Sequence, residues 1–195
     1  MSILLVLVFS FSCQVKVEDE LQTNSKQFND MKPDSASTAI KSIPTSVAET
    51  NTPPDVLFNY TYGIRLLNSA QHKEAIAQFD IVIRVLPNLA IAYENRGIAY
   101  YHEEQYEVAM NDLNKAIELD DKRESAYSHR GIVQYEKGLY DAALSDFDQA
   151  IALNPEYVPA YNNRGRLLIT VGLKEKGMID LEKAIKLYEQ ANDNK

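Results

Sequence analysis

The chain has 195 residues, of which 45% are hydrophobic and 25% are charged, as in an ordinary water-soluble globular protein. Its formal net charge of −8, without a basic cluster, argues against nucleic-acid binding, which requires Lys and Arg to neutralise phosphates. A single cysteine, Cys13, excludes an intramolecular disulfide, and three widely separated histidines predict no metal site and no other cofactor.

The N-terminal segment, residues 1–13, forms a candidate signal peptide. Residues 3–12 read ILLVLVFSFS, an apolar run that is too short to span a bilayer but has the length of a signal-peptide core. Cys13 follows this run directly, and Ser12 supplies a small residue before it. This arrangement resembles a bacterial lipoprotein signal, in which the cysteine is lipidated and becomes the mature N-terminus. An ordinary cleaved secretory signal is the alternative.

The resemblance also implies a location. Ser10 stands where such signals usually have Leu, and no basic residue precedes Lys16, so the match is incomplete. Gln14 follows the cysteine, and in lipoproteins the absence of Asp at this place implies transfer to the outer membrane. We therefore expect a protein of the bacterial cell envelope, held at the outer membrane by an N-terminal lipid anchor. The secretory alternative implies a periplasmic or secreted protein.

Residues 14–55 have the composition of a disordered tether. Apolar residues are scattered without a helical period, and prolines occur at Pro33, Pro44, Pro53 and Pro54. Such a segment buries too little surface to offset the entropy lost on ordering it. A flexible chain of about forty residues would hold the following domain a few tens of Å from its anchor.

From residue 56 onward the sequence repeats itself at one fixed interval. AYENRGIAYY begins at Ala92, AYSHRGIVQY at Ala126 and AYNNRGRLLI at Ala160. Glycine occupies the eighth position of each unit, and the twentieth position is Ala or Gly. A fixed period of this length is the signature of stacked structural repeats. The four units are 56–89, 90–123, 124–157 and 158–191, followed by a polar tail, 192–195.

These units resemble the tetratricopeptide repeat in their period, and each repeat of that family forms two helices, A and B. The resemblance implies an all-α fold, a right-handed α-solenoid of four helix-turn-helix repeats. Small residues at the eighth and twentieth positions let helices A and B approach closely, and Phe or Leu at the twenty-fourth position fills the space beside them. Gly138 and Gly172 supply the turn between the helices.

Charged residues recur in the same phase. The last three units have Arg at the seventh position and Asp at the twenty-third, whereas the first unit has Tyr62 and Gln78 there. Their joint presence and joint loss predict an Arg–Asp contact between helices A and B of one unit. We interpret these contacts as structural, because recurrence once per unit is what a scaffold produces. The predicted pairs are Arg96–Asp112, Arg130–Asp146 and Arg164–Asp180.

The resemblance implies that the A helices line a concave groove, mainly through the second, fifth, ninth, twelfth and thirteenth positions. Repeats of this family that bind the acidic C-terminus of chaperones carry Lys and Asn in the groove, and the fifth positions here do not reproduce that clamp. An apolar groove with tyrosines suits an amphipathic helix or an extended segment of a partner protein. In the alternative interpretation, the groove isoleucines only pack neighbouring A helices together. The candidate partner-binding residues are Tyr60, Ile64, Ile91, Glu94, Ile98, Tyr101, His102, Ser128, Ile132, Tyr135, Asn162 and Arg166.

The sequence favours an adaptor over an enzyme. It has no Ser/His/Asp set and no Gly-rich phosphate loop. A self-assembling scaffold is the alternative to an adaptor, because the last helix has an apolar stripe that a further helix would normally cover and a second copy would cover in a homodimer. This stripe consists of Met178, Leu181, Ile185 and Tyr188.

Overall fold

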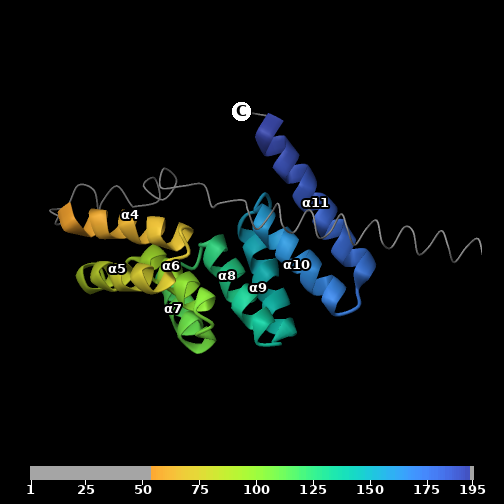
Figure 1. The fold of residues 1–195 in the computed structure, drawn as a ribbon. Helices are drawn as coiled ribbons and strands as arrows, with labels where there is room; N and C mark the ends of the chain where they lie inside the picture. Colours follow the sequence, from red (N-terminus) through yellow and green to blue (C-terminus); the bar gives the residue numbers. More distant parts are fainter. Residues whose placement is uncertain (1–53, 194–195) are drawn as a thin grey trace, which may run out of the picture. The chain divides into compact units, whose positions relative to one another are not determined.

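The computed structural model describes residues 54–193. The candidate lipidation site Cys13, the predicted tether up to residue 53 and the last two residues lie outside the described residues. All regular structure in the described part is helical, which confirms the predicted all-α solenoid (Figure 1). The helices are α4 (Pro54–Asn68), α5 (His72–Val85), α6 (Ala90–His102), α7 (Tyr106–Leu119), α8 (Glu124–Glu136), α9 (Tyr140–Leu153), α10 (Val158–Thr170) and α11 (Lys174–Asp193).

Each repeat unit corresponds to one pair of helices, α4–α5, α6–α7, α8–α9 and α10–α11. The helices extend beyond the predicted units at both ends of the domain. The first begins at Pro54, inside the segment predicted as tether, because proline is well suited to the first turn of a helix. The last continues to Asp193, into the predicted tail, because Gln190 and Ala191 favour helix and no proline or glycine stops it.

The turn inside each unit uses one backbone conformation. The fifteenth residue has a positive φ in all four units: 58° at Ala70, 58° at Glu104, 73° at Gly138 and 86° at Gly172. The next backbone N–H donates to the carbonyl five residues earlier, as from Leu139 to Gln134 at 2.8 Å. This is the Schellman arrangement, which satisfies the last carbonyls of helix A. Gly138 and Gly172 fit it without strain, whereas Ala70 and Glu104 adopt a conformation that side chains disfavour.

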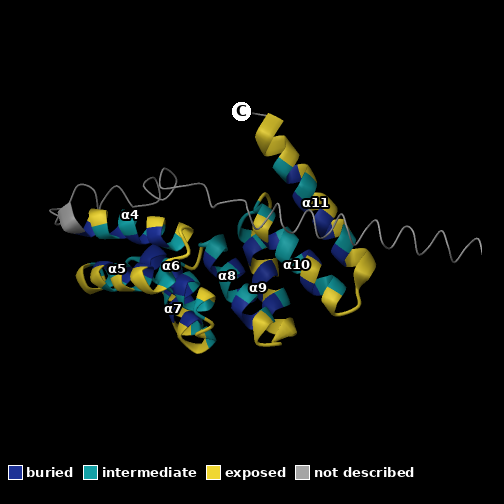
Figure 2. Ribbon diagram, in the orientation of Figure 1, coloured by how far each residue is buried: buried dark blue, intermediate teal, exposed yellow. Residues whose placement is uncertain are grey.

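Helices A and B of one unit pack through the small residues that the repeat pattern identified. Ala75, Ala109 and Ala143 are completely buried, and the Phe147 side chain is 1% exposed. A Cβ atom added to Gly131 would lie 2.6 Å from Cε1 of Phe147, so only glycine fits there without a shift. Figure 2 shows the resulting pattern, with buried residues between neighbouring helices and exposed residues at the turns.

The stack of helices is curved, with the A helices on the inner side. Every helix packs against the next one along the chain. In addition, α4 approaches α6, α6 approaches α8, and α8 approaches α10, whereas within the described residues α5, α7, α9 and α11 make no such close approaches to one another. Because the A helices are closer together than the B helices, the A helices line the concave face.

The C-terminal apolar stripe is partly exposed in the structure. Leu181 is 9% exposed, and Met178, Ile185 and Tyr188 are half-buried. The most exposed large apolar side chain of α11 is instead Ile179, which is 65% exposed. Ile179 occupies the twenty-second position, which is not buried in any of the other three units.

Candidate protein-binding groove

The isoleucines that the sequence predicted in the groove come from successive A helices. Ile64, Ile98 and Ile132 occupy the ninth position of the first three units, and each is half-buried. Half-burial means that the neighbouring helices cover part of each side chain and leave part facing solvent. Ile132 packs against Phe147 of α9 and Leu167 of α10, and all three isoleucines keep a partly exposed apolar surface.

The structure corrects the predicted groove at Ile91 and at the fifth positions of the first three units. Tyr60 is 2% exposed, Glu94 is 3% exposed and Ser128 is 1% exposed, and Ile91 is also buried. The A helices approach one another so closely that these side chains fill the space between them. These side chains are buried, so they offer little surface to a partner. Asn162 differs, because it is half-buried at the fifth position of the last unit.

Glu94 is the centre of a buried charged cluster that joins the second and third units. Arg123 donates from Nε to one carboxylate oxygen of Glu94, and His129 Nδ1 lies 3.0 Å from the other. Burial raises the pKa of the Glu94 carboxyl, but hydrogen bonds and charges from His129 and Arg123 together outweigh burial, so that the pKa falls to about 2. Glu94 is therefore an ionised residue of the joint between units rather than a free groove carboxylate.

A second buried polar group stands at the joint between the first and second units. Asn95 Nδ2 donates to the hydroxyl of Tyr60 at 3.2 Å, and the Tyr60 ring packs edge-on against Phe79 at 6.2 Å between centroids. Burial raises the pKa of Tyr60 above its ordinary range, so the phenol stays neutral. The Tyr60 side chain stabilises the packing of α4 on α6.

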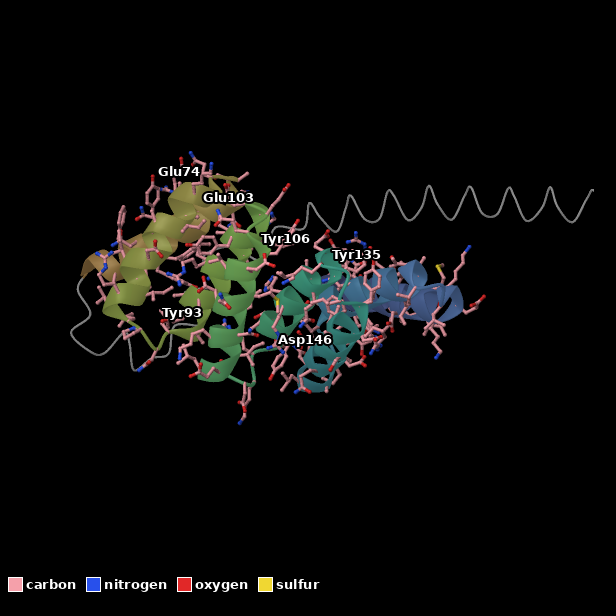
Figure 3. The ribbon with its side chains drawn as sticks, turned by 90° about the horizontal axis from the view of Figure 1, so that it is seen from below. Glu74, Tyr93, Glu103, Tyr106, Tyr135 and Asp146 are labelled. Carbon is pink, nitrogen blue, oxygen red and sulfur yellow. The ribbon has the colours of Figure 1, made fainter. Side chains whose placement is uncertain are left out.

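Two tyrosine pairs lie beside the turns of the second and third units, and we call them the tyrosine rim. Tyr101 and Tyr106 have ring centroids 6.0 Å apart, and Tyr135 and Tyr140 have theirs 5.6 Å apart. Figure 3 places Tyr106 and Tyr135 on the same side of the solenoid. The sequence predicted Tyr101 and Tyr135 as groove residues but not Tyr106 and Tyr140, although these two also lie one repeat apart and could have been identified by that spacing. Partly buried rings with polar hydroxyls are well suited to contact a partner segment.

The hydroxyls on this rim have polar partners. The Tyr135 hydroxyl lies 3.2 Å from Thr170 Oγ1, which connects the third unit to the fourth. Burial raises the pKa of Tyr101, and the nearby Glu136 carboxylate raises it further. The Tyr101 phenol is therefore neutral at physiological pH.

Two histidines that are far apart in sequence meet at the first joint of this rim. His72 begins α5 and His102 ends α6, and their rings stack 4.5 Å apart with an interplanar angle of 11°. Burial lowers the pKa of His102, and the neighbouring His72 and His129 lower it further. The sequence predicted His102 as a groove residue and did not predict the stack, because the two positions are not one repeat apart.

The three predicted Arg–Asp pairs are present, and each arginine also reaches the preceding unit. Arg130 donates from Nε and Nη2 to the two oxygens of Asp146, at 2.7 Å each, and from Nη1 to Asn114 at 2.8 Å. Arg96 and Arg164 make the same double contact with Asp112 and Asp180, at 2.7 Å. Their third contacts are Asp80 and Asp148, at 2.5 Å each.

The three Arg–Asp pairs lie away from the tyrosine rim. In Figure 3 the labelled Tyr93 and Asp146 lie on the other side of the ribbon from Tyr106 and Tyr135. The guanidinium of Arg96 lies 5.6 Å from the centroid of the Tyr93 ring, and Tyr93 donates its hydroxyl to the Pro87 carbonyl at 3.1 Å. The arginines therefore connect helix A, its own helix B and the helix B of the preceding unit.

Two structural observations bear on other kinds of site. Within residues 54–193, no three His, Cys, Asp or Glu side chains gather as they would around a metal ion. None of the described helices combines the length and the apolar character needed to cross a bilayer.

Comparisons with known proteins identify the repeats. Residues 99–138 match a TPR repeat model, and residues 125–157 and 158–190 match tetratricopeptide repeat models. No curated protein sequence matches the chain significantly. The crystal structure of MamA is similar, with a TM-score of 0.62 and 21% identity over 76% of this chain and 86% of that one.

Two structures of RPAP3 are similar as well. The NMR structure of the first TPR domain of the human protein has a TM-score of 0.58 and 24% identity, covering 62% of this chain and 94% of that one. The first TPR of Spaghetti (RPAP3), bound to the HSP90 peptide SRMEEVD, has a TM-score of 0.57 and 23% identity, covering 60% and 93%. At these identities the likeness shows a common fold. Residues 99–190 therefore carry tetratricopeptide repeats, and the paired helices of the described part have the same solenoid fold.

Proposed function

We propose that this protein is an adaptor that binds a segment of a partner protein in its concave groove. The observation that carries the proposal is the half-buried strip formed by Ile64, Ile98 and Ile132, with the tyrosine pairs along its rim. A strip of this kind offers apolar contact to every third or fourth residue of a helix, or to alternate residues of an extended segment. RPAP3 repeats of the same fold hold an HSP90 peptide, which supports this use of the groove.

The buried residues at the fifth positions argue against one kind of recognition, the clamping of an acidic C-terminus. Tyr60, Glu94 and Ser128 are occupied inside the joints between A helices, so the family's lysine clamp for acidic C-termini is not reproduced at these positions. Recognition here depends on the isoleucine floor and the rim. This is the chemistry of an adaptor, and the proposed role requires no reaction to be catalysed.

The experiment is a comparison of two matched variants in co-purification from the native cell. Ile98→Asp together with Ile132→Asp places charge on the groove floor, whereas Ile179→Asp places it at a site that is already 65% exposed on α11. We expect the principal partner to be lost from the groove variant and kept by the Ile179 variant, with both helical by circular dichroism. A partner kept by a folded groove variant contradicts the proposal.

We propose further that the adaptor is a lipoprotein of the bacterial envelope, anchored through Cys13. Support comes from the sequence alone: the apolar run of residues 3–12 ends directly before the only cysteine. Metabolic labelling with an alkyne fatty acid, followed by membrane fractionation, tests this directly. We expect label on the wild type and none on Cys13→Ser, with the variant released from the membrane. An unlabelled wild-type protein found in soluble extracts contradicts a lipid anchor and favours a secreted or periplasmic protein.

Self-assembly as a homodimer has weaker support. The stripe from Met178 to Tyr188 that would make the contact is buried or half-buried. A mass by light scattering that stays at one chain over a wide range of concentration would exclude the homodimer. A mass that rises to two chains would favour it.

A further inference from the structure

Each of the first three B helices is covered by the A helix of the following unit, and the three joints share one hydrogen bond. The arginine at the seventh position of the covering helix donates from Nη1 to the twenty-fifth residue of the B helix beneath it. These bonds are Arg96–Asp80, Arg130–Asn114 and Arg164–Asp148, at 2.5, 2.8 and 2.5 Å. The twenty-fifth position is therefore the place where a B helix receives an arginine from the helix packed on it.

Apolar contacts accompany this bond. Met110 of α7 packs in one cluster with Val133 of α8, and Leu144 of α9 packs in another with Leu167 of α10. Each cluster joins the twenty-first residue of a B helix to the tenth residue of the covering helix. The third residue of the covering helix is a completely buried alanine in all three joints: Ala92, Ala126 and Ala160. The covering helix thus carries a small residue, an arginine four residues later and an apolar residue three residues after that, all on one face.

The last B helix, α11, has the same positions, but no helix among the described residues covers them. Met178 and Ile185, at the twenty-first and twenty-eighth positions, are half-buried, and Glu182, at the twenty-fifth, is exposed. We call these three residues the C-terminal face. In the described part of the chain, Glu182 makes no hydrogen bond and no ion pair. The C-terminal face therefore has the acceptor of the earlier joints without the arginine that such an acceptor binds.

A second copy of this chain, added head to tail, does not fit the C-terminal face. Its first helix, α4, would be the covering helix, with Phe58, Tyr62 and Arg65 in place of the alanine, the arginine and the apolar residue. Phe58 is 62% exposed, and its ring is much larger than the alanines that are completely enclosed in the other joints. Arg65 would bring a charge to a place where the later units bury an apolar side chain, and Tyr62 has no guanidinium for Glu182.

We propose that the C-terminal face binds an arginine-bearing helix of a different protein, at a site separate from the concave groove. The small residue of the partner helix lets the two helices approach closely, its arginine pairs with Glu182, and its apolar residue packs on Met178. This site goes beyond the proposed groove function, because it gives the adaptor a second partner. The protein can then join a segment held in the groove to a helix held at the end of the solenoid.

Ile179 lies outside the C-terminal face, although it is on the same helix. The twenty-second position stays exposed in the first three units, where a following helix is packed on the B helix. A helix docked on the C-terminal face would therefore leave Ile179 exposed as well. Substitutions at Ile179 remain suitable controls for both sites.

The proposal can be tested by selecting binders from a library of displayed helices, with the full chain as target. One helix of a stable three-helix scaffold is randomised on its solvent-facing side, and the selected scaffolds are titrated by fluorescence anisotropy. Wild type is compared with Glu182→Arg and with Glu74→Arg, an equal charge reversal at an exposed position of α5. The double variant Ile98→Asp, Ile132→Asp identifies binders that use the groove instead.

We expect a class of binders that carry the small residue, the arginine and the apolar residue at the spacing of the A helices. Their affinity should fall about tenfold with Glu182→Arg and should be unchanged with Glu74→Arg and with the groove variant. Replacing the arginine of the binder by Glu should weaken binding to wild type by a similar factor. The same replacement should restore binding to Glu182→Arg, because the two charges are then exchanged.

Binders without an arginine at this spacing, or with equal affinity for wild type and Glu182→Arg, would overturn the proposal. A library that yields only groove binders would also overturn it. A mass by light scattering that rises to two chains for wild type and stays at one for Glu182→Arg would show that a second copy occupies the C-terminal face, again against the proposal. Each of these results would leave the proposed groove function standing.

Discussion

Arg130 gives the sharpest prediction about stability. Its guanidinium makes two 2.7 Å bonds to Asp146 and one 2.8 Å bond to Asn114, and it lies 5.5 Å from the centroid of the Tyr127 ring. The Asp146 side chain is 8% exposed, so Arg130→Ala would leave a carboxylate almost without solvent and without a cation. We expect the free energy of unfolding to fall by about 3 kcal/mol, at the lower end of the range for breaking a buried pair.

The lower end is appropriate because the Arg130 side chain is 21% exposed, so water reaches the site when the arginine is removed. In a domain of this size, about 3 kcal/mol corresponds to a decrease in Tm of about 10 °C. The assay is denaturant unfolding followed by circular dichroism. Arg65→Ala is the control, because Arg65 is exposed and its only recorded side-chain partner within the described residues is the ring of Tyr62, so its loss should cost less than ~1 kcal/mol.

A double-mutant cycle separates the interaction energy of Arg130 with Asp146 from any general disruption of the fold. Asp146→Ala leaves Arg130 with Asn114 and partial contact with water, so it should cost about 2 kcal/mol, and the coupling energy should also be about 2 kcal/mol. A coupling energy under about 0.5 kcal/mol would refute our interpretation, because the two side chains would then contribute independently.

Three further predictions concern the turns, the core and pH. Glu104→Gly should raise the free energy of unfolding by about 1 kcal/mol, because Glu104 has a φ of 58°; no gain would show that this turn is unstrained. Gly131→Ala should cost about 1–3 kcal/mol, because its Cβ would lie 2.6 Å from Phe147, and a neutral result would refute the close packing. Because folding lowers the pKa of His102, the free energy of unfolding should have its full value above about pH 6.5 and should fall toward pH 5. The fall should be less steep in His72→Tyr, which keeps an aromatic ring but cannot be protonated. Equal pH profiles for wild type and His72→Tyr would exclude an effect of the stacked pair.

The sequence predicted the helices and their pairing well, because the residues that define them recur at fixed positions of each repeat unit. The glycine at the eighth position and the small residue at the twentieth determine how closely helices A and B pack, and this packing is local to one unit. The contact of Arg130 with Asp146 was predictable for the same reason, since both residues belong to one unit and change together in the first. Its contact with Asn114 was not predicted, because it joins two units.

The groove was predicted less completely, because burial there depends on the distance between A helices of different units. Glu94 and Ser128 occupy positions that the family pattern assigns to the groove, yet neighbouring helices cover them. The stack of His72 on His102 also joins two units and follows no repeat spacing. Contacts between units depend on how the helix pairs stack, and the period of a single sequence does not determine that geometry.

The central claim is that partners bind on the concave face, and site-specific photocrosslinking in the native cell tests it most directly. A photoreactive residue is placed at Tyr101 on the groove rim and, in a second version, at the exposed Ile179 on α11. We predict that position 101 captures one dominant protein, through a single segment of it, and that position 179 captures none in comparable yield. Capture of that protein from position 179 alone, with both versions folded, would contradict the account.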